Sequence, residues 1–143
     1  MCGIAGIINH RQEEDFERLL NPMLRSMQHR GPDATGIYTS HEAGLGHARL
    51  SIIDLSGGHQ PMHNEDRTIW IVFNGEIFNY PELRTDLIAK GHRFYTQSDT
   101  EVIIHLYEEH GRQVFEHLNG QFAIAIWDHN RHCLLLEIGR AHV

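Results

Sequence analysis

The chain has 143 residues, of which 41% are hydrophobic and 22% charged, with 12 basic and 19 acidic side chains. This length and apolar content suit one globular domain and exclude a disordered chain, while the shortness of the apolar runs excludes a membrane-spanning helix. The net charge of −7 argues against nucleic-acid binding, and because no secretory signal precedes the two cysteines, Cys2 and Cys133, we expect a cytoplasmic protein.

Hydrophobic patterning predicts a strand first and then a helix. Gly3–Ile8 is a short apolar run typical of a buried strand. Residues 13–28 carry apolar side chains at helical spacing, with a break expected at Pro22 because proline is favoured at the first position of a helix. Three further strands are predicted at residues 36–40, 44–53 and 68–73.

Two helices and a hairpin complete the predicted order. Residues 81–90 form a helix that Gly91 ends, and a capping box at residues 98–101 begins a second helix, which Gly111 ends. Strands at both ends of the chain, with helices between them, indicate an α+β fold with antiparallel pairing. The last two elements are the strands of a hairpin, 121–127 and 133–136.

Polar, glycine-containing clusters lie at the ends of predicted strands, where a rigid scaffold presents functional groups. Single motifs also have structural explanations: Asn74-Gly75 is a strong turn signal, Asp99 suits a helix N-terminus, and Arg49 suits a solvated strand face. The clusters are 29–33, 46–52, 58–62, 74–76 and 98–101.

Cys2 directly follows the initiator methionine. Removal of Met1 would leave a cysteine whose thiol lies beside its own α-amine, a base with an ordinary pKa of ~7.7–8.0. N-terminal threonine nucleophiles use the same pairing of a nucleophile with its own amine. Cys133 lies in an apolar run and is interpreted as a buried small hydrophobe.

In this order, the clusters resemble the glutamine amidotransferase domains of the N-terminal-nucleophile hydrolases. Within that family, residues 1–136 are similar to the amino-terminal half of the glutamine-hydrolysing asparagine synthetases. The resemblance implies a four-layer αββα sandwich that is truncated at its C-terminal end. The matching segments are MCGIAGI, HRGPDATG, GLGHARLSIIDL, GGHQPM, FNGEIFNY, LIAKGHRFYTQSDTEVIIHLYEEHG and LNGQFAIAIWD.

The resemblance also implies which residues act on glutamine. Cys2 would attack the side-chain amide of glutamine, with its α-amine as the base. Asn74 and the backbone N–H of Gly75 would donate hydrogen bonds to the oxyanion that forms, and a missing donor of this kind typically costs ~10²–10³ in rate.

The same resemblance assigns the residues that hold the amino-acid end of glutamine. Arg49 would bind the α-carboxylate, because a guanidinium fork suits a carboxylate in a bidentate pair. Asp99 and Glu76 would bind the α-ammonium group. Backbone groups of three more residues would line the pocket: Leu50, Ile52 and Ile53.

No metal or cofactor is expected in this chain. His41, His47, His59 and His63 lie in one loop-rich region, but their spacing fits no familiar zinc pattern and no cysteine pair accompanies them. The resemblance implies that ATP and Mg²⁺ bind a separate C-terminal synthetase domain, which uses the ammonia to convert aspartate to asparagine. It also implies a homodimer for the full-length protein.

The sequence allows two alternatives. The acceptor of the ammonia could be a different carboxylate, or the fragment could be inactive because a missing strand leaves an open sheet edge. The similarity ends at Leu136, and the final Ile-Gly-Arg-Ala-His-Val matches the translation of a common sequencing adapter. We therefore interpret residues 137–143 as a non-native tail.

Overall fold

The computed structural model describes residues 2–9, 15–50 and 58–139. Its helices are α1 (Phe16–Ser26), α2 (Tyr80–Ala89), α3 (Asp99–His110) and the 3₁₀ helix η1 (Gly111–His117). None of the helices in these ranges is long and apolar enough to span a membrane. The strands are β1 (Gly3–Ile8), β2 (Ala34–Thr39), β3 (Ala43–Arg49), β4 (Met62–His63), β5 (Ile69–Ile77), β6 (Gly120–Asp128) and β7 (Cys133–Gly139).

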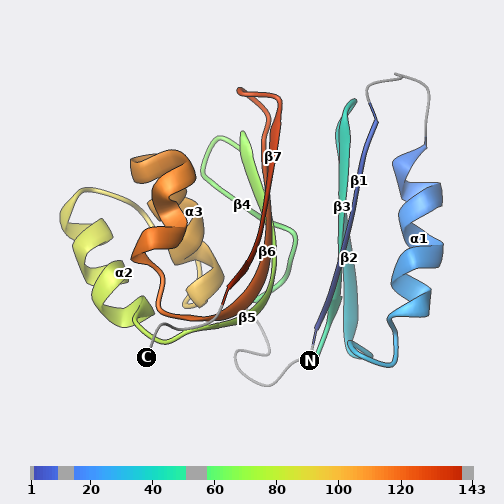
Figure 1. The fold of residues 1–143 in the computed structure, drawn as a ribbon, viewed down its shortest axis with the longest axis horizontal. Coiled ribbons are helices and arrows are strands. Elements are labelled where there is room, and N and C mark those ends of the chain that lie inside the picture. Colours follow the sequence, from blue (N-terminus) through green and yellow to red (C-terminus); the bar gives the residue numbers. More distant parts are fainter. Residues whose placement is uncertain (1, 10–14, 51–57, 140–143) are drawn as a thin grey trace.

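Two antiparallel sheets face each other, and helices cover their outer faces (Figure 1). One sheet has the strand order β1-β3-β2 and is covered by α1, while the other has the order β4-β5-β6-β7 and is covered by α2 and α3. The layers are therefore helix, sheet, sheet and helix. This confirms the α+β class and the four-layer αββα sandwich expected from the sequence.

Helix α1 continues through the break that was expected at Pro22. Asp15 caps its first turn, and Phe16, Leu20 and Leu24 form the buried face at a spacing of four residues. A proline inside a helix costs about 3 kcal/mol or more. Burial contributes about 1.5–3 kcal/mol for each of the three large apolar side chains, which outweighs that cost and keeps the helix continuous.

Strand β5 runs four residues beyond its predicted end at residue 73, because Asn74-Gly75 forms no turn. Asn74 lies opposite Ala123 of β6, and Gly75 lies opposite Phe122. A Cβ atom on Gly75 would lie 2.2 Å from the carbonyl oxygen of Gln121, so this close approach of the strands requires glycine. The interpretation of the motif as a turn is therefore wrong.

Helix α3 begins at the N-cap Ser98, but the predicted capping box is not formed. The backbone N–H of Ser98 donates to Thr96 Oγ1 (3.1 Å) and not to Glu101. The fully buried Glu101 carboxylate instead accepts hydrogen bonds from the backbone N–H groups of Tyr95 and Thr96, both at 2.7 Å. Glu101 therefore ties the preceding loop to the helix.

Strand β7 extends three residues beyond Leu136, to Gly139. The extension pairs with β6, because a backbone ladder requires no particular side chains. Residues 140–143 of the expected tail lie outside the described residues. The domain boundary at Leu136 stays a prediction.

A small apolar cluster joins the two sheets. Side chains alternate between the two faces of β3, so His47 and Arg49 lie on the same face as Leu45, toward the space between the sheets. The larger core lies between the second sheet and helices α2 and α3. The cluster between the sheets comprises Ala43, Leu45, Val72, Ala125 and Trp127.

Candidate active site

A cleft of about 710 Å³ is lined by residues of both sheets and of the start of α3. Every predicted site residue that the structure describes lines this cleft. Ile52 and Ile53 lie outside the described residues. The predicted residues in the cleft wall are Cys2, Arg49, Leu50, Asn74, Gly75, Glu76 and Asp99.

Cys2 lies immediately before β1, and the pairing of β1 with β3 brings it next to the end of β3. Gly3 is opposite Ala48 in this pairing, so the Cys2 thiol reaches the backbone of Leu50. The Leu50 N–H donates to Cys2 Sγ at 3.4 Å, and Sγ donates to the Leu50 carbonyl oxygen at 3.7 Å. Arg30 Nε donates to the Cys2 carbonyl oxygen at 3.2 Å. These contacts hold the thiol in the cleft wall.

Arg49 is the last residue of β3 and is only 6% exposed. The segment around Gly31 packs directly on this part of the strand, since a Cβ atom on Gly31 would lie 2.2 Å from the Ala48 carbonyl group. The Asp33 N–H also donates to the Arg49 carbonyl oxygen at 3.0 Å. The cluster at residues 29–33 therefore fixes the backbone that carries the Arg49 side chain.

Asp99 is the first residue of α3, and its carboxylate contacts the end of β5. Asp99 Oδ2 accepts a hydrogen bond from the Ile77 N–H at 3.1 Å. Burial raises the pKa of Asp99 above its ordinary value, although the hydrogen bond from Ile77 opposes this shift. Glu76 precedes Ile77 and is exposed, so the two carboxylates lie at different depths in the cleft wall.

Gln60 lines the cleft and was not predicted as a site residue. Its side-chain oxygen accepts from the Phe73 N–H at 2.6 Å, and its amide nitrogen donates to Thr100 Oγ1 at 3.4 Å. Gln60 thereby links β5 to α3. The cluster at residues 58–62 marked this segment in the sequence, but a bridging role depends on contacts far apart in the chain.

His47 is also in the cleft wall and is 1% exposed. The pKa of His47 is lowered to about 4, mainly by burial; a hydrogen bond with the Phe73 backbone opposes this shift, and the positive charge of Arg49 adds to it. The imidazole is therefore neutral at neutral pH. Its Nε2 has no hydrogen-bond partner among the residues that the structure describes.

The buried neutral state of His47 predicts a loss of stability in acid. Its pKa is about 4 in the folded chain and 6.5 in the unfolded chain, so the unfolded chain binds more protons between these values. The free energy of unfolding should therefore fall by on the order of 3 kcal/mol as the pH decreases through this window. Urea denaturation at several pH values measures the slope.

His47→Gln should remove this part of the slope, while His41→Gln, at an exposed position, should retain it. Equal slopes in the wild-type chain and in His47→Gln would contradict the assignment. If His47→Gln does not fold, NMR titration of the His47 ring in the wild-type chain decides the question, because an apparent pKa near 6.5 would contradict it as well.

The four histidines considered for zinc do not assemble a site. In the described part of the chain, no three of them form a group of metal ligands. His63 instead packs its ring against Trp70 and Tyr95, at centroid distances of 4.7 and 5.7 Å.

The chain matches a known protein family over nearly its whole length. A family model described as a glutamine amidotransferase domain matches residues 1–142. The chain belongs to this family. The amidotransferase domain is 46% identical over 137 residues to asparagine synthetase [glutamine-hydrolyzing] 1 from Bacillus subtilis (strain 168), covering 94% of this chain and 22% of that protein.

Other relatives give the same result. Asparagine synthetase [glutamine-hydrolyzing] 3 from Arabidopsis thaliana is 43% identical over 129 residues, covering 90% of this chain and 22% of that protein. Asparagine synthetase [glutamine-hydrolyzing] 2 from Bacillus subtilis is 45% identical over 139 residues, covering 95% of this chain and 18% of that protein. The amidotransferase domain thus spans about a fifth of the length of these curated relatives.

Solved structures share the fold. Glutamine phosphoribosylpyrophosphate amidotransferase from B. subtilis superposes with a TM-score of 0.71 at 22% identity, covering 90% of this chain and 35% of that one. An allosteric regulatory enzyme of purine biosynthesis also gives a TM-score of 0.71, at 23% identity, covering 88% of this chain and 35% of that one. The arrangement of two facing sheets between helices is therefore shared with these two enzymes.

Proposed function

We propose that this domain hydrolyses glutamine to glutamate and ammonia, with Cys2 as the nucleophile. The observation that carries the proposal is that Cys2, Arg49, Asn74-Gly75 and Asp99 all line one cleft. Free glutamine offers a carboxamide to attack, a carboxylate to pair with a cation, and an ammonium group to pair with an anion. The cleft offers the complementary group for each.

The reaction follows from these groups. The α-amine of processed Cys2 accepts the thiol proton, directly or through water, and the thiolate attacks the side-chain carbonyl carbon of glutamine. Asn74 and the Gly75 N–H donate hydrogen bonds to the oxyanion of the tetrahedral intermediate. Ammonia then leaves with the transferred proton, and water hydrolyses the thioester to give glutamate and the free thiol.

Glutamate release by the purified chain tests the proposal. After mass spectrometry has confirmed that Met1 is absent, the chain should convert glutamine into equal amounts of glutamate and ammonia. A folded chain that binds glutamine without releasing glutamate would contradict the proposed hydrolysis.

In the same proposal, Arg49 binds the α-carboxylate of glutamine, while Asp99 and Glu76 bind the α-ammonium group. Backbone groups of Leu50 complete this part of the pocket. The buried position of Arg49 and the presence of all four residues in the cleft wall support these roles. Ile52 and Ile53, which the resemblance also implies, complete the proposed set.

Asp99→Asn and Arg49→Ala should each raise the KM for glutamine by about 30-fold or more, because losing one partner of a buried charge pair costs about 2–5 kcal/mol. The kcat should change less, since both groups contact the substrate away from the reacting amide. Initial-rate kinetics measure both constants. Glu82→Gln, in the exposed first turn of α2, is the control and should match the wild-type chain.

The raised pKa of Asp99 adds a pH dependence to the same prediction. Binding of the ammonium group requires the carboxylate, so glutamine affinity should fall as the pH decreases through this pKa, above the ordinary value of 3.8. Calorimetry with Cys2→Ala measures binding without turnover, and Asp99→Asn should lose this dependence.

Wild-type KM values in Asp99→Asn and Arg49→Ala would contradict the proposed binding residues.

We further propose that the domain supplies ammonia to a C-terminal synthetase domain in a cytoplasmic, homodimeric full-length protein. That domain would bind ATP and Mg²⁺ and convert aspartate to asparagine. The support is that the relatives are glutamine-hydrolysing asparagine synthetases of which this chain covers about a fifth. Growth of an asparagine auxotroph that carries the full-length gene tests the acceptor, and failure of an expressed, glutamine-hydrolysing protein to restore growth would contradict it.

A further inference from the structure

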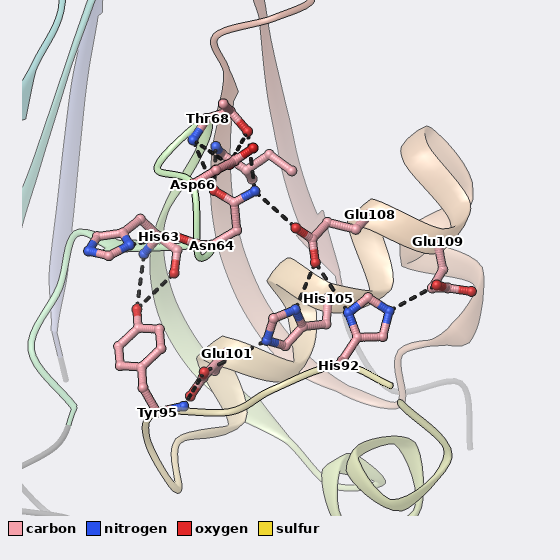
Figure 2. Close-up of polar contacts among 11 residues, drawn as sticks. His63, Asn64, Asp66, Thr68, His92, Tyr95, Glu101, His105, Glu108 and Glu109 are labelled. Carbon is pink, nitrogen blue, oxygen red and sulfur yellow. Dashed lines mark hydrogen bonds and ion pairs between the residues drawn. The ribbon is translucent and has the colours of Figure 1, made fainter. Parts of the chain in front are cut away.

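A second group of titratable side chains lies outside the cleft, beside α3 (Figure 2). His105 and Glu108 belong to α3, and His92 belongs to the loop that joins α2 to α3. One ligand atom from each of the three side chains lies within 4.8 Å of the others. The His105 side chain is 1% exposed, whereas those of His92 and Glu108 are 15% and 23% exposed, so the group can be reached from solvent on one side.

We propose that His92, His105 and Glu108 bind a divalent metal ion of the zinc class. Glu108 Oε2 lies 2.7 Å from His105 Nδ1 and 3.4 Å from His92 Nδ1, so the three atoms converge on one point. Ligand atoms at about 2.0–2.1 Å from a tetrahedral zinc ion are about 3.3 Å apart. Small side-chain rotations are therefore enough to admit the ion.

The outward nitrogen of each imidazole faces a carboxylate. His92 Nε2 lies 2.9 Å from Glu109 Oε1, and His105 Nε2 lies 3.7 Å from Glu101 Oε1 (Figure 2). A carboxylate beside Nε2 can hold the proton on that nitrogen once a metal has displaced the proton from Nδ1, which is the usual arrangement around metal-binding histidines. Both rings thus offer Nδ1 to the same point.

The Glu108 carboxylate is also oriented by a neighbouring side chain. Asn64 Nδ2 donates to Glu108 Oε1 at 2.9 Å, which leaves Oε2 to face the two rings. The direction of the Asn64 amide is itself fixed, because Asn64 Oδ1 accepts from the N–H groups of Thr68 (2.9 Å) and Ile69 (3.0 Å). Carboxylates that bind metals are typically held in this way by a hydrogen bond from a neighbouring side chain.

The ligand types favour zinc over magnesium or calcium. Two imidazole nitrogens with one carboxylate oxygen form a set that zinc accepts, with a fourth position left for water. Magnesium and calcium prefer oxygen ligands throughout. Burial lowers the pKa of His105, but the neighbouring carboxylates of Glu101 and Glu108 outweigh this effect and raise the pKa to about 9, so the metal must displace a proton.

This proposal departs from the expectation of a chain without metal. Sequence rules for zinc sites rely on short ligand spacings, whereas His92 reaches α3 from a separate loop. The site is independent of the cleft, so its test does not depend on glutamine hydrolysis.

Calorimetric titration of the chelator-treated full chain with Zn²⁺ tests the proposal. We expect one ion per chain at this site, with an affinity that falls by at least about 100-fold in His92→Gln and Glu108→Gln, since even outer-shell partners contribute about 10- to 100-fold. Glu109 is such an outer-shell partner, so Glu109→Gln should lower the affinity for Zn²⁺ by about 10- to 100-fold. Circular dichroism checks that each variant folds.

The control addresses adventitious binding by the 13 histidines of the chain. His117→Gln removes an exposed imidazole that stacks on His110 at 4.0 Å, and it should bind Zn²⁺ as tightly as the wild-type chain. Co²⁺ should give the visible absorption of a tetrahedral site in wild type and not in His92→Gln. The absence of Zn²⁺ binding, equal affinity in wild type and His92→Gln, or displacement of Zn²⁺ by equimolar Mg²⁺ would each overturn the proposal.

Discussion

Replacing Cys2 by alanine is expected to lower kcat for glutamate release by at least about 10³-fold, because no other group in the proposed mechanism can form the thioester. Binding of glutamine should change little, since Arg49 and Asp99, the residues proposed to bind its amino-acid end, are intact. A coupled glutamate assay measures turnover, and calorimetry measures binding.

Cys133→Ala is the matched control, because it removes the second cysteine, which lies at the start of β7 outside the cleft wall. It should retain wild-type turnover. A chain with one extra residue fixed before Cys2 should be as inactive as Cys2→Ala, since its α-amine no longer lies beside the thiol. Substantial glutamate release by Cys2→Ala would exclude Cys2 as the nucleophile.

The second large effect is expected at the oxyanion. Asn74→Ala should lower kcat by about 10²–10³, with a nearly unchanged KM, because its side chain would bind the oxyanion of the intermediate more strongly than the ground-state amide. The fold should survive, since Asn74 is only half-buried and its backbone still pairs with Ala123 of β6. Initial-rate kinetics separate the two constants.

Asn21→Ala is a control for the loss of an asparagine side chain far from the cleft. Asn21 lies in α1, where its side chain donates to the Glu17 carbonyl oxygen at 2.9 Å. This variant should keep the wild-type kcat. An Asn74→Ala variant with wild-type kcat would remove Asn74 from the proposed mechanism.

Local patterns in the sequence predicted the strands and helices where tertiary contacts agree with them. Gly3–Ile8 forms β1 with the expected bounds, and the helix predicted at 81–90 is α2, displaced by one residue. The prediction of a break at Pro22 was wrong, because burial of one face of α1 outweighs the local cost of a proline inside a helix. The short strand β4 and the 3₁₀ helix η1 were not predicted, since neither has a distinct periodicity of its own.

The residues of the candidate site also include some that sequence motifs predicted and some that only tertiary contacts reveal. The predicted residues of the cleft came from motifs whose order along the chain resembles a known family, and the pairing of β1 with β3 brings two of these motifs together. Gln60 and His47 were not assigned to the site, because their roles depend on burial and on contacts with β5 and Arg49. Glu101 was assigned to a cap by spacing, yet the loop before α3 offers its carboxylate better donors.

The length of β5 couples the stability of the core to the stability of the cleft. The same strand carries the core residues Ile71 and Phe73 and then, without interruption, Asn74 and Gly75 at the cleft. Amides in such a continuous central strand open only with the most stable part of a protein. Asn74 and Gly75, the proposed oxyanion donors, are therefore as stable as the core that β5 belongs to. A core substitution that loosens β5 should remove activity and cooperative unfolding together, without a partly open but active intermediate.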